Sequence, residues 1–429
     1  MNQGINQCDR EDLESIALLH LNKQLTILSQ SNPFYRDKIF ASGLRLPIVD
    51  LQAYLRQFPF TNKTEIERDQ QKYPPYGSNF TYPVARYCRY SQTSGSTGKP
   101  LRWLDTEESW QWMVENWKHV FAAADVTAKD SVFFAFSFGP FLGFWVAFDA
   151  ARQIGCLCIP GGAMNSVARL HSLIENKASV LCCTPTYALH LANVAHAQNI
   201  DLSKASVRAI IAAGEPGASI PASRARLQEL WPGARIYDHH GMTEIGPASY
   251  ECPKRPGVLH IIEPEFIAEV IAQESGEPVG HGGTGELVLT NLGRVASPLL
   301  RYRTGDIVKL AEKEVCECGS SEMALEGGIL GRCDDMVQIR GVNVYPGAVE
   351  QIIRAFPEII EYQVEVFQQS DMNEMAIRVE PTPDHVDEKL SHRIEQAFKL
   401  NLSLRIPIEI VAPNTLPRFE MKAKRWVKK

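Results

Sequence analysis

The stretch Ser131–Gly241 contains the segments SVFFAF (131–136), CLCIP (156–160), SVLCCTP (179–185), VRAIIAAG (207–214) and ARIYDHHG (234–241). Each segment is a short apolar run of strand length, and helical patterns such as SVARLHSLIENKA (166–178) lie between them. Strands that alternate with helices pair in parallel, in a sheet that helices cover on both faces. The stretch therefore predicts an α/β fold with a parallel sheet.

The pattern changes on the C-terminal side of this stretch. FIAEVIA (266–272), GELVLTN (285–291) and LLRYRTGD (299–306) are shorter strand patterns separated by glycine-rich turns. They predict a β-rich subdomain at about 247–332.

A second change comes at Gly331. Beyond it the pattern is a strand, a helix (347–356), a strand, a helix (384–400) and a strand that ends near Val411. This order predicts a small α+β domain. The expected domains are therefore a large N-terminal domain (1–332) and a small C-terminal domain (333–429).

The composition is that of an ordinary globular protein, with 45% hydrophobic and 22% charged residues. The formal net charge of -6 argues against a nucleic-acid-binding protein, which usually has a basic surface. Most of the ten cysteines lie in apolar strands, unlike those of a secreted disulfide framework. The start MNQGINQCDREDLE lacks the apolar core of a signal peptide. These features predict a cytoplasmic protein.

One segment, Val132–Ala151 (VFFAFSFGPFLGFWVAFDAA), is almost long enough to span a bilayer. A Gly-Pro pair at 139–140 interrupts it near the middle, and Asp149 lies near its end. We therefore expect a buried strand at Ser131–Phe136, a turn, and a buried helix from about Phe141, with no membrane partner.

The segment SQTSGSTGKP (91–100) contains two glycines among five hydroxyl residues. Backbone N–H groups in such a loop can turn toward an anion, and the hydroxyls and Lys99 add donors for phosphate oxygens. A P-loop motif is excluded, because Gly-x4-Gly-Lys-Ser/Thr is not present. Taken alone, the segment could equally be a polar linker.

Four further motifs follow in order: YDHHGMTE (237–244), YRTGD (302–306), GRCDDMVQIRGVNVYP (331–346) and PRFEMKAKR (417–425). With the loop at 91–100 they resemble the ordered motifs of the acyl-adenylate-forming superfamily of acyl-CoA synthetases, adenylation domains and luciferases. The segment PFTNKT before the loop and the short chain resemble the phenylacetate–coenzyme A ligase branch. The likeness covers the whole chain.

The resemblance implies an AMP-forming acid–thiol ligase that uses ATP, Mg²⁺ and coenzyme A. A small carboxylic acid would react with ATP to give an acyl-adenylate and pyrophosphate, and the thiol of coenzyme A would then displace AMP. Positioning and charge neutralisation would drive both steps without a nucleophilic side chain. Transfer to a carrier-protein pantetheine or to an amine stays an alternative, as does a homodimer. A non-catalytic nucleotide-binding homologue is a further alternative, against which Glu244, Asp306, Arg332 and Lys422 argue.

For the nucleotide, the resemblance implies contacts from the hydroxyl-rich loop, the Thr-Glu pair and an aspartate. Thr243 resembles the phosphate contact and Glu244 the magnesium ligand, since a hard cation prefers oxygen. Asp306 resembles the carboxylate that accepts both ribose hydroxyls. Taken alone, these residues would be ordinary turns. The expected loop residues are Thr93, Ser94, Gly95, Ser96, Thr97, Gly98 and Lys99.

The resemblance places adenine along the segment that follows the strand VRAIIA, with Asp238 accepting from the exocyclic amine. The family often has an aromatic residue at the position of His240, so the histidine is a departure, although its ring can stack. The expected residues around the base are Ala213, Gly214, Glu215, Pro216, Asp238, His239, His240, Gly241 and Met242.

An acyl pocket in this branch would be lined by aromatic and small residues, which favours a flat aromatic acid over a long alkyl chain. The same rings could instead be ordinary core. The expected pocket residues are Phe136, Phe138, Phe141, Gly214, Met242 and Pro247.

The C-terminal motifs imply a small mobile domain that rotates between the two half-reactions. Arg332 resembles the arginine near ribose and phosphate, and Asp334 resembles the hinge. Lys422 resembles the mobile lysine whose cation stabilises charge that develops at the carboxylate and the α-phosphate. The family usually has glycine before this lysine and methionine stands here, so Lys424 stays a second candidate. The expected pantetheine tunnel residues are Arg340, Gly341, Val342 and Asn343.

Two short ligand pairs, Cys252-x7-His260 and Cys316-x-Cys318, predict a metal site. Zinc favours four sulfur or nitrogen ligands in a tetrahedron, and both pairs lie in the β-rich region. Some members of the phenylacetate ligase branch have a similar set. Four protein ligands leave no open position for water, so the predicted zinc is structural. The alternative is a set of unrelated loop residues, with His260 at the end of a strand.

Overall fold

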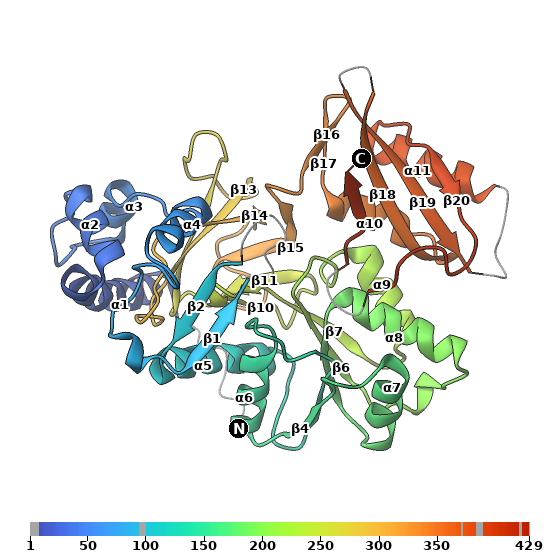
Figure 1. Ribbon diagram of the computed structural model, residues 1–429, viewed down its shortest axis with the longest axis horizontal. Helices are drawn as coiled ribbons and strands as arrows, with labels where there is room; N and C mark the ends of the chain where they lie inside the picture. The colour runs from blue at the N-terminus through green and yellow to red at the C-terminus, as the bar shows by residue number, and fades with distance from the viewer. Residues whose placement is uncertain (1–7, 94–99, 370–371, 383–388, 420–422, 429) are drawn as a thin grey trace. The chain divides into compact units, whose positions relative to one another are not determined.

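The structure of the chain is a computed structural model that describes residues 8–93, 100–369, 372–382, 389–419 and 423–428 (Figure 1). The chain forms two compact units, each built from several stretches of sequence. Unit 1 comprises residues 1–130, 137–158 and 239–328, and unit 2 comprises residues 131–136, 159–238 and 329–429. The boundary between residues 332 and 333 that the sequence suggests stays a prediction.

Unit 1 begins with helices that start at polar caps, as at Asp9, whose side chain accepts from the N–H of Asp12. Leu21 of α1 (Arg10–Ser31) packs in one core with Tyr54 of α3 (Leu51–Gln57) and with Ile267 of strand β12 (Phe266–Ile271). The helices are α1 (Arg10–Ser31), α2 (Pro33–Ser42), α3 (Leu51–Gln57), α4 (Lys63–Lys72), α5 (Glu107–Ala123) and α6 (Trp145–Ile154).

The large sheet of unit 1 has six strands in the order β10-β11-β15-β14-β13-β12, and its described pairs are antiparallel. The strands are β10 (Ser249–Glu251), β11 (Val258–Ile261), β12 (Phe266–Ile271), β13 (Thr284–Asn291), β14 (Tyr302–Leu310) and β15 (Ala324–Arg332). Two small hairpins accompany it: β1 (Arg89–Gln92) with β2 (Arg102–Asp105), and β8 (Gly241–Met242) with β9 (Gly246–Pro247). The β-rich character expected after residue 247 is thus present.

The five apolar runs form one sheet in the order β4-β3-β5-β6-β7, with β3, β5 and β6 paired in parallel. Its strands are β3 (Ser131–Phe134), β4 (Leu157–Pro160), β5 (Val180–Cys183), β6 (Ala209–Ala213) and β7 (Arg235–His239). The helices α7 (Ser166–Glu175), α8 (Pro185–Ala197) and α9 (Pro221–Leu230) alternate with these strands and share a core with them. The predicted α/β fold is confirmed.

The C-terminal part of unit 2 is an α+β body with the strand order β20-β19-β18-β21. Its elements are β16 (Val337–Ile339), β17 (Val342–Val344), α10 (Pro346–Arg354), β18 (Ile359–Gln369), β19 (Met372–Pro381), α11 (Leu390–Leu402), β20 (Ile408–Ile410) and β21 (Trp426–Lys428). The two helices and the sheet share one apolar core. The predicted helix at 384–400 overlaps α11, and residues 383–388 lie outside the described part.

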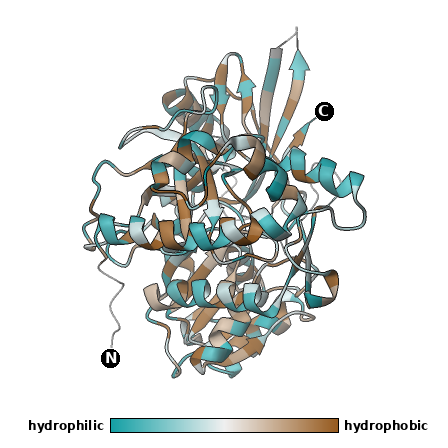
Figure 2. Cartoon of the chain, turned by 90° about the vertical axis from the view of Figure 1, so that its left-hand side faces the viewer, coloured by the Kyte–Doolittle hydropathy of each residue, from teal (hydrophilic) through white to brown (hydrophobic). Residues whose placement is uncertain are grey.

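Within the apolar segment at 132–151, the end of the strand and the start of the helix differ from expectation. The strand stops at Phe134 instead of Phe136, and the helix starts at Trp145 instead of Phe141. Between them the backbone of Phe138 is left-handed (φ 52°), a conformation that neither a strand nor a helix accepts. In the described part of the chain, no helix is long and apolar enough to cross a bilayer. Figure 2 shows hydrophilic and hydrophobic residues interleaved along the helices.

Candidate functional site

The Thr243–Glu244 pair forms the turn of the short β8–β9 hairpin in unit 1, where Met242 pairs with Gly246. Glu244 is buried, and the phenol of Tyr302 donates to its Oε1 at 3.3 Å. A buried carboxylate at a tight turn is a fixed anionic ligand of the kind that a hard cation prefers. The residues at this turn therefore fit the expected Mg²⁺ site.

Arg294, between β13 and β14, supports this turn, although nothing in the sequence motifs singles it out. Its Nη1 donates to the carbonyl oxygens of Thr243 (2.7 Å) and Glu244 (2.8 Å). Its Nε and Nη2 donate to the two oxygens of Asp105 at 2.7 and 2.6 Å, and neither side chain is exposed to solvent. A buried charge of this kind is tolerated because it is paired with a carboxylate and each of its three nitrogens donates a hydrogen bond.

Asp105 belongs to the hairpin that carries the hydroxyl-rich loop. It ends β2, and β2 pairs with β1, so that the chain between these two strands is the loop. At the base of the loop, the N–H of Thr93 donates to the carbonyl of Leu101, whose N–H donates to Oγ1 of Thr93. The Arg294–Asp105 pair thus joins the Thr243–Glu244 turn to the hairpin that carries the loop, at the end of this hairpin away from the loop.

Asp306, the expected ribose ligand, lies on β14 and is buried. Its Oδ2 is 2.9 Å from Nε2 of His240, which is also buried. The histidine that departs from the usual aromatic residue is therefore bonded to the predicted ribose carboxylate. The two residues are far apart in sequence, and no motif predicts this contact.

His239, also expected around the base, is buried, and its ring is held by two contacts. Its Nδ1 is bonded to the carbonyl of Ser249 at 2.7 Å, and its ring packs on Trp117 with 4.3 Å between ring centroids. Burial lowers the pKa of His239 to about 3, so the ring is neutral at physiological pH. A neutral, packed ring positions the chain before His240.

In unit 2, the segment expected along adenine follows β6, and Gly214 has φ 95°. Oε1 of Glu215 accepts from the N–H of Thr186 at 3.0 Å. Asp238 near the end of β7 accepts a hydrogen bond from the hydroxyl of Ser219, so this carboxylate is fixed in place as well.

The expected hinge residue Asp334 and the tunnel residues Arg340 and Gly341 occupy turns, whereas the tunnel residues Val342 and Asn343 lie on β17. Nε of Arg332 donates to Oδ1 of Asp334 at 2.9 Å. Arg340 and Gly341 join β16 to β17 with φ 46° and 81°, the positive pair that a two-residue hairpin turn requires. Arg340 is also paired with Glu374 at 2.7 Å.

The four expected zinc ligands, Cys252, His260, Cys316 and Cys318, lie together in unit 1, and their ligand atoms are all within 4.8 Å of one another. Sγ of Cys252 is 3.7 Å from Sγ of Cys316, close to the edge of about 3.8 Å of a tetrahedron with Zn–S bonds of about 2.3 Å. His260 directs Nε2 to within 3.4 Å of the Cys318 sulfur, and its Nδ1 is bonded to the carbonyl of Glu322. A second bond of this kind orients a metal-binding imidazole. The donor set fits zinc.

Comparison with known proteins places these features in a family. Residues 90–294 match the family described as AMP-binding enzyme, and residues 341–429 match the AMP-binding enzyme C-terminal domain. The phenylacetate-coenzyme A ligase of Thermus thermophilus is 30% identical over 437 residues, which cover 96% of this chain and 95% of the relative. The chain belongs to the AMP-binding enzymes, in their phenylacetate–coenzyme A ligase branch.

Further relatives of this AMP-binding enzyme agree. The phenylacetate-coenzyme A ligase of Escherichia coli is 29% identical over 97% of this chain and 94% of its own length. A crystal structure of 2-hydroxyisobutyryl-CoA ligase in the postadenylation state, with 2-HIB-AMP, has a TM-score of 0.92 at 25% identity and covers 98% of this chain and 90% of its own. The same enzyme with 2-HIB-AMP and CoA in the thioesterification state gives 0.74 at 26% identity, covering 98% and 91%.

Several residues predicted for this AMP-binding enzyme are not assembled into a described site. Phe136 and Gly214 belong to unit 2, whereas the other pocket candidates belong to unit 1. The ring of Phe138 is half-buried and packs on the partly exposed Trp145 at 4.8 Å between centroids. The acyl pocket therefore stays a prediction. The predicted residues outside the described part are Ser94, Gly95, Ser96, Thr97, Gly98, Lys99 and Lys422.

Proposed function

We propose that this protein activates a carboxylic acid with ATP, as an acyl-adenylate, and transfers the acyl group to the thiol of coenzyme A. AMP and pyrophosphate are the other products. The full-length similarity to phenylacetate-coenzyme A ligases is the observation that carries this proposal. A cytoplasmic location and small-molecule partners are part of it.

The residues of the chain divide the work between binding and charge neutralisation. Glu244 would hold Mg²⁺, which would supply positive charge to the phosphates when bound. The backbone around Thr243 stays in place because Arg294 binds its carbonyl. Asp306 accepts the ribose hydroxyls, with His240 as a donor that keeps the carboxylate oriented. Lys422 supplies the cation at the reacting phosphate. Asp334 is the hinge between the two half-reactions.

The acid is proposed to be aromatic, because aromatic side chains dominate the predicted pocket. We expect benzoate- or phenylacetate-like acids to give the highest turnover, at least about tenfold above octanoate and longer acids, since a flat pocket excludes a long flexible chain. Acid-dependent pyrophosphate exchange over a panel of acids measures this. A panel in which octanoate or a longer acid outpaces every aryl acid would contradict the aromatic pocket.

We also propose that Cys252, His260, Cys316 and Cys318 hold a structural zinc ion. Burial raises the pKa of the Cys252 thiol, so a bound cation is needed to keep this sulfur as a thiolate. Since the ligands meet only in the folded chain, zinc affinity adds to folding stability.

Protein purified without added metal should contain close to one zinc per chain by elemental analysis. Cys316→Ser should lose the zinc and melt several degrees lower, because one of the four ligands is gone. Cys8→Ser, at a cysteine outside the cluster, is the matched control and should keep both properties. Metal-free protein with unchanged melting temperature and full activity would refute the site.

A further inference from the structure

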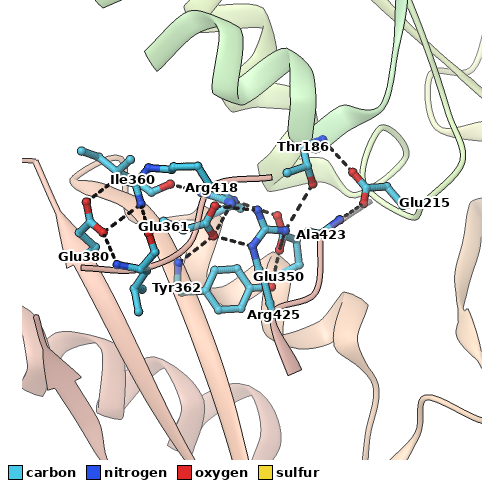
Figure 3. Close-up of polar contacts among 12 residues, drawn as sticks. Thr186, Glu215, Glu350, Ile360, Glu361, Tyr362, Glu380, Arg418, Ala423 and Arg425 are labelled. Atoms are coloured by element: carbon cyan, nitrogen blue, oxygen red, sulfur yellow. Dashed lines mark hydrogen bonds and ion pairs between the residues drawn. The ribbon is translucent and has the colours of Figure 1, made fainter. Parts of the chain in front are cut away.

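The carboxylate of Glu215 joins two distant segments of unit 2 (Figure 3). Its Oε1 accepts from the N–H of Thr186 at 3.0 Å, and its Oε2 accepts from the N–H of Ala423 at 2.9 Å. The amide of Ala423 is the peptide bond to Lys422, which itself lies outside the described residues. Glu215 therefore binds the chain directly after the lysine proposed for adenylation.

The position of Glu215 is fixed by the start of α8. Thr186 lies in the first turn of this helix, where unpaired N–H groups and the helix dipole favour a carboxylate. The loop can approach so closely because it contains Gly217, at which a Cβ atom would lie 2.7 Å from Cβ of Pro185. The loop after β6 thus delivers a fixed anion.

Arg425 makes a second contact with the same turn. Its Nη1 is 3.4 Å from Oγ1 of Thr186, and its Nε donates to Oε1 of Glu361 at 2.6 Å. Glu350 lies 3.7 Å from the same guanidinium. Figure 3 shows Arg425 with Thr186 and Glu361, beside the Glu215 carboxylate.

The Glu215–Ala423 and Arg425–Thr186 contacts can break without leaving a buried charge unpaired. If the segment at Ala423 moves away, Arg425 keeps Glu350 and Glu361, which belong to the same C-terminal body. Glu215 keeps the N–H of Thr186. Since an uncompensated buried charge is the costly outcome, this arrangement permits reversible release.

We propose that Glu215 is a positioning residue that holds the C-terminal segment at Ala423 during adenylate formation and releases it before thioester formation. This inference rests on the proposed function. It assigns the side chain of Glu215 to the C-terminal segment, whereas the sequence resemblance groups the residue with the adenine contacts. The two assignments predict different kinetic changes.

The test compares Glu215→Ala and Glu215→Gln with wild type in the two half-reactions, using the aryl acid with the fastest exchange. For Glu215→Ala, kcat of pyrophosphate exchange should fall about 10- to 100-fold, because two charge-assisted bonds are lost. KM for ATP and the rate of thioester formation from pre-made acyl-adenylate should change less than about threefold. Glu215→Gln, which keeps one acceptor oxygen, should lie between.

Glu229→Gln is the matched control. Glu229 is an exposed carboxylate on α9 that pairs with Arg226 of the same helix, so its replacement should leave both half-reactions unchanged. Unchanged exchange kcat, a raised KM for ATP alone, or equal loss of both half-reactions would each overturn the inference. If Glu215→Ala does not fold, Glu215→Gln decides by the same criteria. Wild-type protein without exchange on any acid would instead contradict the proposed function.

Discussion

Replacing Arg294 with methionine is expected to lower the free energy of unfolding by roughly 3–5 kcal/mol and the rate of pyrophosphate exchange by about a hundredfold or more. The substitution leaves Asp105 buried without its ionic partner. It also removes the two hydrogen bonds that Arg294 donates to the carbonyls of Thr243 and Glu244. These bonds hold the turn at the proposed magnesium site. Urea unfolding gives the stability, and exchange is measured at a temperature where the variant is folded.

Two controls separate stability from positioning. The double variant Arg294→Met/Asp105→Leu should recover much of the stability, because no charge is left unpaired, but should stay inactive. Arg301→Met removes a comparable buried pair with Glu269 and should lose stability while keeping most of the exchange activity. An Arg294→Met protein that is as stable and active as wild type would contradict the role given to Arg294.

Replacing Lys422 with alanine is expected to slow adenylation by about a hundredfold or more, the scale of a lost transition-state charge contact. Thioester formation from pre-made acyl-adenylate should survive, because that step breaks the bond to AMP after the lysine has acted. Pyrophosphate exchange and thioester release measure the two steps separately.

Lys424→Ala is the matched variant for this prediction, since it removes the neighbouring lysine of the same motif. It should leave adenylation close to wild type. If Lys424→Ala is impaired and Lys422→Ala is not, the lysine is assigned to the wrong position of the motif.

The sequence predicted the parts of this protein that depend on local patterns. Alternating apolar runs predicted the parallel sheet, because strand length and burial are visible in short segments. The spacing of Cys316 and Cys318, and of Cys252 and His260, predicted four ligands that lie together in the structure. The five ordered motifs are also short local patterns, and their resemblance led to the AMP-binding enzyme family.

The contacts that support the site could not be predicted, because they join residues far apart in the chain. Nothing in the sequence marks Arg294 as the partner of Asp105, or His240 as the partner of Asp306. The wrong start of the helix at Phe141 has a local cause. Gly143 has φ 41°, a conformation that an α-helix does not accept, so the helix begins only at Trp145; an apolar pattern does not show the backbone conformation of a glycine within it.

The most direct test of the proposed two-step activity is the acid panel run first without and then with coenzyme A. If the protein forms an acyl-adenylate and passes it to coenzyme A, pyrophosphate exchange should depend on the acid in the absence of coenzyme A, and AMP and acyl-coenzyme A should be released stoichiometrically once the thiol is added. Exchange that no acid supports, or an adenylate that coenzyme A fails to discharge, would contradict it.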